Sequence, residues 1–133
     1  MNEQKTINLI NRLSNAQLKK TTNLHCSYDA EDNLHLAEIK NRRSYYSTKM
    51  IEASKMFVNF QKAQLKGKTF IYVVTDSKGL YVFNITRLID TIIQRDIVKK
   101  ELPSKTDFQG GKEIMKYYYN LEEEMSSLTF VFD

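Results

Sequence analysis

The stretch NLHLAEIKNRR, residues 33–43, combines residue types that can catalyse reactions of phosphate esters. Glu38 and Lys40 stand two positions apart in a segment that predicts a strand, so their side chains share one face. A carboxylate can hold a divalent cation that lowers the pKa of a bound water, and a nearby ammonium can stabilise charge developing on a phosphate. The pattern therefore predicts hydrolysis of phosphodiesters, with Arg42 and Arg43 on flanking phosphates.

The residues around this pair predict a β-hairpin. Residues 24–29 and 34–40 have the composition of two strands, and the polar residues 30–33 have the composition of the turn that joins them. The side chains that face Glu38 then depend on the register of the hairpin, because a shift of one residue turns each side chain to the other face.

The simplest register pairs Asp29 with Leu34 across the four-residue turn. It places His25 directly opposite Glu38, with Asp29 further along the same face. We therefore expect Glu38, Lys40 and His25 to emerge together from one face of the sheet.

These residues resemble the PD-(D/E)XK nuclease superfamily, in particular small nucleases of phages or mobile elements. The residues that carry the resemblance are Leu34, Leu36, Glu38, Ile39, Lys40, Asn41 and Arg42. The resemblance covers about residues 2–85 and implies a restriction-endonuclease-like core, in which a helix precedes a strand pair with the catalytic acid and the E-x-K. A crossover helix and further strands complete that core.

The chain departs from the superfamily at the second acid. An aspartate is expected about a dozen residues before the glutamate, but His25 stands thirteen residues before Glu38, and the nearest upstream aspartate is Asp29. Three alternatives follow: Asp29 serves through another register, His25 replaces the acid, or the site is catalytically silent. An imidazole is a poor ligand for Mg²⁺ and a better one for Mn²⁺.

The resemblance assigns roles to the candidate residues. The catalytic candidates are Glu38, Lys40, Asp29 and His25; the metal ligands are Glu38, Asp29, His25 and the carbonyl of Ile39; the nucleic-acid contacts are Arg42, Arg43, Lys49 and Lys55. The implied activity is DNA hydrolysis with Mg²⁺ or Mn²⁺. The alternative is a catalytically silent module of the same fold that binds nucleic acid or a protein.

The charge distribution supports a nucleic-acid partner. The net charge is +4, but residues 38–68 hold eight basic residues and only two acids. Such an excess is typical of a phosphate-facing surface, and equally of a solvated helix face. Tyr45 and Tyr46 follow the arginines and could stack on bases or pack at the rim of the core. DNA is the expected partner, RNA and a homodimer stay open, and no membrane partner is expected.

The remaining elements predict a single α/β domain over residues 1–133, with a core over 2–85 and an irregular extension over 86–133. The predicted helices cover residues 2–20 and 47–65, the latter capped by Ser47. The further strands are 69–75, 79–85 and 128–132; residues 87–100 fit helix or strand, and 112–125 a short helix or irregular structure. Together they predict a central mixed sheet of four to five strands flanked by helices.

Composition bounds the setting of the protein. The 133 residues are 41% hydrophobic and 27% charged, which is ordinary for a globular protein. The sequence contains no apolar run long enough for a transmembrane helix, and its first residues lack the features of a signal peptide. Cys26 is the single cysteine, so an internal disulfide is excluded and a cytoplasmic setting is expected.

Overall fold

Two β-sheets and three α-helices make up the described part of the chain, which in this computed structural model comprises residues 1–23, 25–103 and 113–133. The helices are α1 (Glu3–Leu13), α2 (Ala53–Lys66) and α3 (Ile85–Ile92), with a 3-10 turn η1 (Glu123–Met125). The strands are β1 (Lys19–Lys20), β2 (Ala30–Glu31), β3 (His35–Asn41), β4 (Thr48–Glu52), β5 (Thr69–Thr75), β6 (Gly79–Asn84), β7 (Val98–Pro103), β8 (Glu113–Glu122) and β9 (Leu128–Val131).

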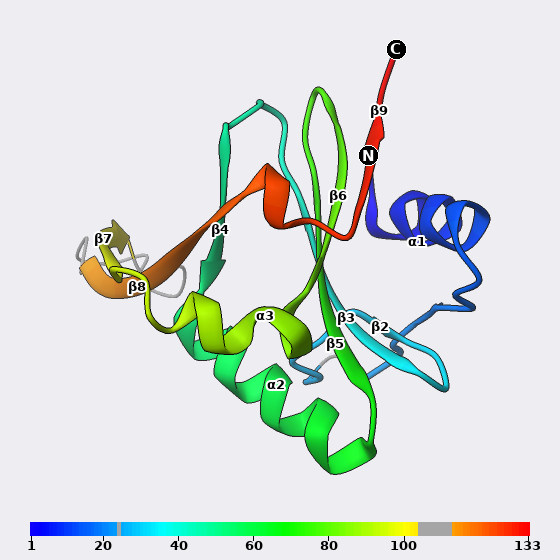
Figure 1. The fold of residues 1–133 in the computed structure, drawn as a ribbon, viewed down its shortest axis with the longest axis horizontal. Coiled ribbons are helices and arrows are strands. Elements are labelled where there is room, and N and C mark those ends of the chain that lie inside the picture. Colours follow the sequence, from blue (N-terminus) through cyan, green and yellow to red (C-terminus); the bar gives the residue numbers. More distant parts are fainter. Residues whose placement is uncertain (24, 104–112) are drawn as a thin grey trace.

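The larger sheet has six strands in the order β1-β2-β3-β5-β6-β9 (Figure 1). Strands β3 and β5 are parallel, and all its other neighbours are antiparallel. A parallel pair needs a crossover, and here the chain makes it through β4 and α2. The chain is thus a single α/β domain with a mixed sheet, which is larger than the predicted four to five strands.

Helices cover both faces of this sheet. Helix α1 packs Ile7 and Ile10 on one face, against Ala37 and Ile39 of β3. Helices α2 and α3 pack on the opposite face, where Leu36 of β3 is buried (Figure 1). Because side chains alternate along a strand, Glu38 and Lys40 belong to the α2 face together with Leu36.

Helix α1 ends earlier than the predicted helix over residues 2–20. Ser14 leaves the helical conformation, and both its N–H and its hydroxyl donate to the carbonyl of Ile10, at 3.0 and 2.8 Å. The Asn11 side chain then holds the backbone N–H and carbonyl of Leu18, at 2.9 and 3.0 Å. These contacts direct the chain back along the helix toward the edge strand β1.

The segment predicted as a helix over residues 47–65 is divided between two elements. Residues 48–52 form β4, and α2 begins only at Ala53, so Ser47 is not its N-cap. Strand β4 buries Ile51 and pairs with β8, a partner about 70 positions away in sequence. Helix α2 ends at Gly67, whose left-handed φ of 66° is readily adopted by glycine.

The second sheet is antiparallel, with the order β4-β8-β7. It corrects the sequence prediction for residues 113–122, which form a long strand instead of a short helix or irregular structure. Residues 87–100, which fit helix or strand by sequence, contain both: the end of α3 and the start of β7. The region after residue 85 is therefore not an irregular extension. The sequence also predicts a loop over residues 103–111, and these residues lie almost wholly outside the described part of the chain.

Two predictions from the same half of the chain are confirmed. Strands β5 and β6 form the hairpin expected over residues 69–85. The Asp76 carboxylate accepts backbone N–H groups of Lys78 and Gly79 at 2.8 and 3.1 Å, which fixes the turn. The terminal strand is β9, paired with β6 at the edge of the large sheet.

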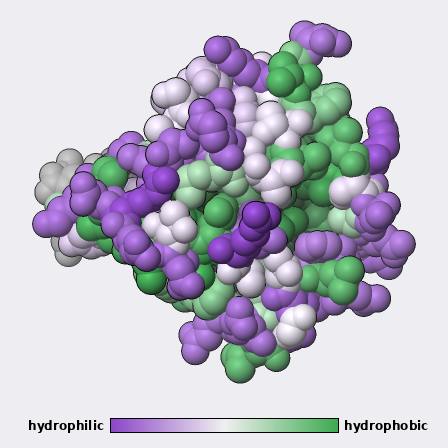
Figure 2. Space-filling model, in the orientation of Figure 1, coloured by the Kyte–Doolittle hydropathy of each residue, from purple (hydrophilic) through white to green (hydrophobic). Residues whose placement is uncertain are grey.

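The surface differs between the two ends of the molecule. Figure 2 shows apolar residues gathered on the side that carries α1 and β9, whereas hydrophilic residues predominate over the three-stranded sheet. Exposed Val131 and Phe130 belong to the apolar side. No helix within the described residues is long and apolar enough to cross a membrane.

Candidate active site

The register of the hairpin decides which acid stands beside Glu38. Ala30 pairs with Ala37, and Glu31 pairs with Leu36, so the expected pairing of Asp29 with Leu34 is wrong. The observed register carries Asp29 to the position beside Glu38.

Asp29 is fixed at that position by two hydrogen bonds to β3. Its backbone N–H donates to the carbonyl of Ala37 at 2.8 Å, and its Oδ2 accepts the backbone N–H of Ile39 at 2.7 Å. The carboxylate thus continues the hairpin pairing where β2 itself has stopped. Burial raises the pKa of Asp29, and the hydrogen bond from Ile39 opposes that rise.

His25 lies away from this position. It is exposed in the loop before β2, where its backbone N–H donates to the Asn23 side chain at 3.0 Å. The loop is held on α2 instead of on β3, because Ser27 contacts Asn59 at 2.6 Å and Lys62 at 2.7 Å. The prediction that His25 faces Glu38 across a strand pair is therefore wrong.

Glu38 has an unusual environment for a carboxylate. Its Oε2 is buried and has no hydrogen-bond partner among the described residues. Burial raises the pKa of Glu38 to about 7, with smaller upward contributions from Asp29 and Glu52, while Lys55 and Lys40 act in the opposite direction. A carboxylate that is buried beside two others and incompletely paired is typical of a functional site.

Glu38 opens into a pocket of about 270 Å³ between the two sheets. Its walls come from β3, β4, β5, β7, β8 and α2, and its lining residues are Glu38, Lys40, Arg42, Met50, Glu52, Lys55, Tyr72, Lys100, Lys116 and Tyr118. Five of these residues are cationic and two are acidic, so the lining carries a positive excess around the buried carboxylate.

Glu52 and Tyr72 connect the walls of the pocket. The Glu52 carboxylate lies 3.7 Å from Lys55 on α2 and 3.7 Å from Lys116 on β8. The Tyr72 hydroxyl donates to the carbonyl of Met50 on β4 at 2.8 Å. These contacts attach the second sheet to the first and bring Lys116, which sequence reasoning did not single out, to the same pocket as Glu38.

The predicted nucleic-acid contacts separate into two groups. Arg42 and Lys55 line the Glu38 pocket, and exposed Arg43 lines an adjoining hollow together with Arg42. Lys49 does not belong to this surface, because it is only 2% exposed and its ammonium lies 2.9 Å from Asp76 and 3.0 Å from Glu123. The prediction that Lys49 borders Glu38 on an exposed basic surface is corrected accordingly.

The carboxylate oxygens of the candidate site suit a divalent cation that prefers oxygen ligands, such as Mg²⁺. Within the described residues, no group of three or more His, Cys, Asp or Glu side chains is placed to hold an ion. Mg²⁺ is commonly held by one or two carboxylates, with water and substrate phosphates completing the shell. Asp29 and Glu38 provide such a pair, and the buried, unpartnered Oε2 of Glu38 is the atom that a cation would contact.

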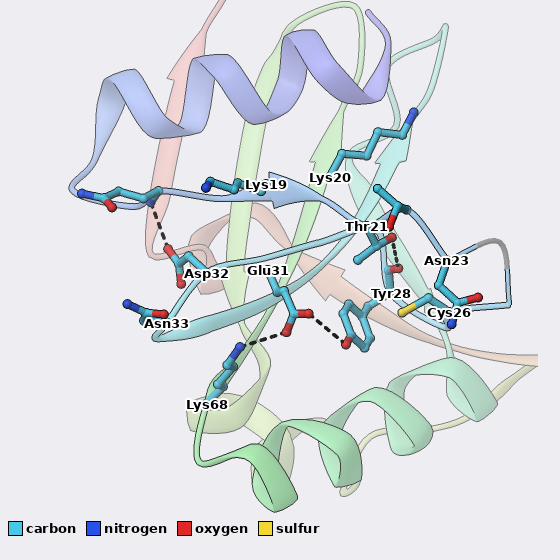
Figure 3. Close-up of a pocket in the computed structure, with 12 residues that line it drawn as sticks. Lys19, Lys20, Thr21, Asn23, Cys26, Tyr28, Glu31, Asp32, Asn33 and Lys68 are labelled. Atoms are coloured by element: carbon cyan, nitrogen blue, oxygen red, sulfur yellow. Dashed lines mark hydrogen bonds and ion pairs between the residues drawn. The ribbon is translucent and has the colours of Figure 1, made fainter.

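A larger pocket of about 620 Å³ lies beside β1 and β2, but its two carboxylates, Glu31 and Asp32, are already paired. Figure 3 shows the Glu31 carboxylate between the hydroxyl of Tyr28, at 3.3 Å, and the ammonium of Lys68, at 2.9 Å. Asp32 accepts three backbone N–H groups, which lower its pKa despite partial burial. These contacts stabilise the hairpin, and the pocket lacks the unsatisfied carboxylate that marks the Glu38 site.

The chain was compared with known proteins. No protein-family model matches it, and no curated protein is significantly similar to it. The candidate site therefore rests on the geometry of Asp29, Glu38 and Lys40 and on the charges around them.

Proposed function

We propose that this protein is a metal-dependent deoxyribonuclease of the PD-(D/E)XK type, with its centre at Asp29, Glu38 and Lys40. The observation that carries the proposal is the hairpin register, which brings Asp29 beside Glu38 through its hydrogen bond to Ile39. The order of α1, the hairpin, α2 and the strands β5 and β6 agrees with the core that the resemblance implies.

Asp29 and Glu38 would hold the cation, with the Ile39 carbonyl as a further ligand. Mg²⁺ or Mn²⁺ bound there would polarise the phosphate and lower the pKa of a water. Glu38 must be ionised for this role, and its pKa of about 7 means that metal affinity rises as the pH passes through neutrality.

The cationic lining would act on the substrate. Lys40 lies two positions beyond Glu38 on the same face, where its ammonium can orient the attacking water and stabilise the charge that develops on the phosphate. Arg42, which follows β3, and Lys55, on α2, both line the pocket and can neutralise flanking phosphates. The positive excess of the lining thus favours a polyanion over a neutral substrate.

The second candidate is a catalytically silent module of the same fold that binds DNA. One observation favours it: the described residues contain no group of three potential metal-binding side chains. Such a module would retain DNA binding through Arg42 and Lys55 but would bind no divalent cation at Asp29 and Glu38.

Cleavage of labelled DNA with Mg²⁺, Mn²⁺ or a chelator separates the two candidates. The nuclease requires that cleavage depends on metal, falls at least about a hundredfold in Asp29→Asn and Glu38→Gln, and falls in Lys40→Ala. His25→Ala is the matched control, since His25 is exposed outside the pocket and its loss leaves cleavage unchanged. Equal background cleavage in all four variants and the wild type refutes the nuclease and favours the silent module.

A further inference from the structure

A smaller hollow of about 240 Å³ continues from the Glu38 pocket. It is lined by Arg42, Tyr46, Thr48, Met50 and Lys100, and it shares three of them, Arg42, Met50 and Lys100, with the pocket itself. A ligand extending out of the Glu38 pocket in this direction would therefore meet two cations and one aromatic ring.

Tyr46 presents its ring to solvent on a fixed piece of backbone. The residue is 57% exposed, which is uncommon for a large aromatic side chain. Its carbonyl accepts a hydrogen bond from the buried ammonium of Lys49, which anchors the backbone between β3 and β4 while the ring stays exposed to solvent. The neighbouring Tyr45 differs, because its ring packs on the ammonium groups of Lys49 and Lys78, at 4.5 and 3.9 Å.

The dimensions of the Glu38 pocket restrict what can reach the carboxylates. A volume of about 270 Å³ is at the lower end for small-molecule sites and suits a group about the size of one nucleotide. Both sheets contribute to its walls, one through β3 and β5 and the other through β4 and β8. A flexible single strand can direct one phosphodiester into this pocket and its neighbouring base into the adjoining hollow, whereas a base of a duplex must first leave the stack, at a cost of a few kcal/mol.

We propose that the substrate is single-stranded DNA and that the Arg42–Tyr46–Lys100 hollow binds the nucleotide next to the scissile phosphate. The base stacks on the Tyr46 ring, and the flanking phosphate contacts Arg42 and Lys100. A cationic groove combined with an exposed aromatic ring is the usual means of binding a single strand without base-specific contacts. This inference rests on the proposed nuclease function and adds the class of DNA that the site accepts.

The test measures binding in the presence of a chelator, so that cleavage does not interfere. Fluorescence anisotropy compares a labelled single-stranded oligonucleotide with the blunt duplex of the same sequence. Wild-type protein binds the single strand at least about tenfold more tightly, and Tyr46→Ala weakens single-strand binding about 5- to 100-fold. Tyr46→Phe retains the ring and the affinity, while Phe130→Ala removes an exposed ring outside the hollow and changes nothing.

Equal affinity for both DNAs, with no effect of Tyr46→Ala, overturns the inference. The proposed function survives that result if Arg42→Glu still weakens both DNAs, because the pocket then binds phosphates without selecting a single strand. If neither DNA binds and Arg42→Glu changes nothing, the proposed function fails, and the inference fails with it.

Discussion

The Glu38 pocket and the Lys49 cluster use the same residue types for opposite purposes. Both bring lysine and carboxylate side chains together close to the junction of the two sheets. In the Lys49 cluster the ammonium contacts Asp76 at 2.9 Å and Glu123 at 3.0 Å, and it lies 4.1 Å from the centre of the Tyr81 ring. Each charge there has a partner, and the cluster joins β4 to the β5–β6 turn.

In the Glu38 pocket, the buried Oε2 of Glu38 has no such partner among the described residues. Burial acts on both sites, but at Glu123 the hydrogen bonds from Lys49 and Tyr45 outweigh it and hold the pKa below its usual value. At Glu38 burial prevails, reinforced by Asp29 and Glu52, and the pKa rises to about 7. The difference teaches that pairing, and not residue type, separates a structural cluster from a candidate site.

Breaking the Lys49 cluster has the largest expected effect on stability. Lys49→Met leaves the buried Asp76 and the partly exposed Glu123 without their cation, and it lowers the free energy of unfolding by about 3–5 kcal/mol. Urea denaturation measures the loss. Lys55→Met, the matched change at an exposed ion pair, costs under about 1 kcal/mol. Similar losses in the two variants would contradict the structural role of Lys49.

Neutralising Glu38 acts in the opposite direction. Its pKa is raised on folding, so the ionised carboxylate destabilises the fold above pH 7, and this penalty disappears as the pH falls toward the unfolded value of 4.5. Glu38→Gln therefore raises the free energy of unfolding at pH 8 by on the order of 2 kcal/mol and has little effect at pH 4.5. Metal-free urea denaturation at both pH values checks this, and a loss of stability at pH 8 would contradict it.

The salt dependence of DNA binding tests whether the cations of the Glu38 pocket contact phosphates, unlike the paired Lys49. Under the proposed function, Arg42→Gln and Lys55→Gln should each remove one phosphate contact and reduce the slope of log affinity against log salt by about one unit. Lys66→Gln is the control, since Lys66 lies at the far end of α2 and pairs with Glu31. A slope unchanged in all three variants would mean that the pocket cations do not contact DNA.

The sequence predicts those parts of the fold that local composition determines. The β-branched and aromatic runs of β5 and β6, with the polar turn at Asp76, are sufficient to predict the hairpin. The alternation around Glu38 and Lys40 places them on one face without knowledge of the partner strands. The choice between Asp29 and His25 as the residue beside Glu38 depends on the register of β2, which local composition does not determine.

Long-range contacts determine the parts of the fold and of the site that local composition does not predict. The chain before β2 turns away from β3 because Ser27 is bound by Asn59 and Lys62, more than 30 positions later. Strand β4 precedes α2 without a break and is defined only by its pairing with β8. By sequence alone, Lys49 cannot be distinguished from the surface cations near it. Its burial and its ion pairs with Asp76 and Glu123 arise only from the fold.

Metal binding by the Asp29–Glu38 pair tests the central claim most directly. Calorimetric titration of Mn²⁺ into the wild type at pH 8 should show one site, with affinity about tenfold weaker at pH 6 because Glu38 is then largely protonated. Asp29→Asn and Glu38→Gln should each lose the site, while His25→Ala should bind as the wild type does. Binding that survives in Glu38→Gln, or that disappears in His25→Ala, would contradict the assignment of the metal to Asp29 and Glu38.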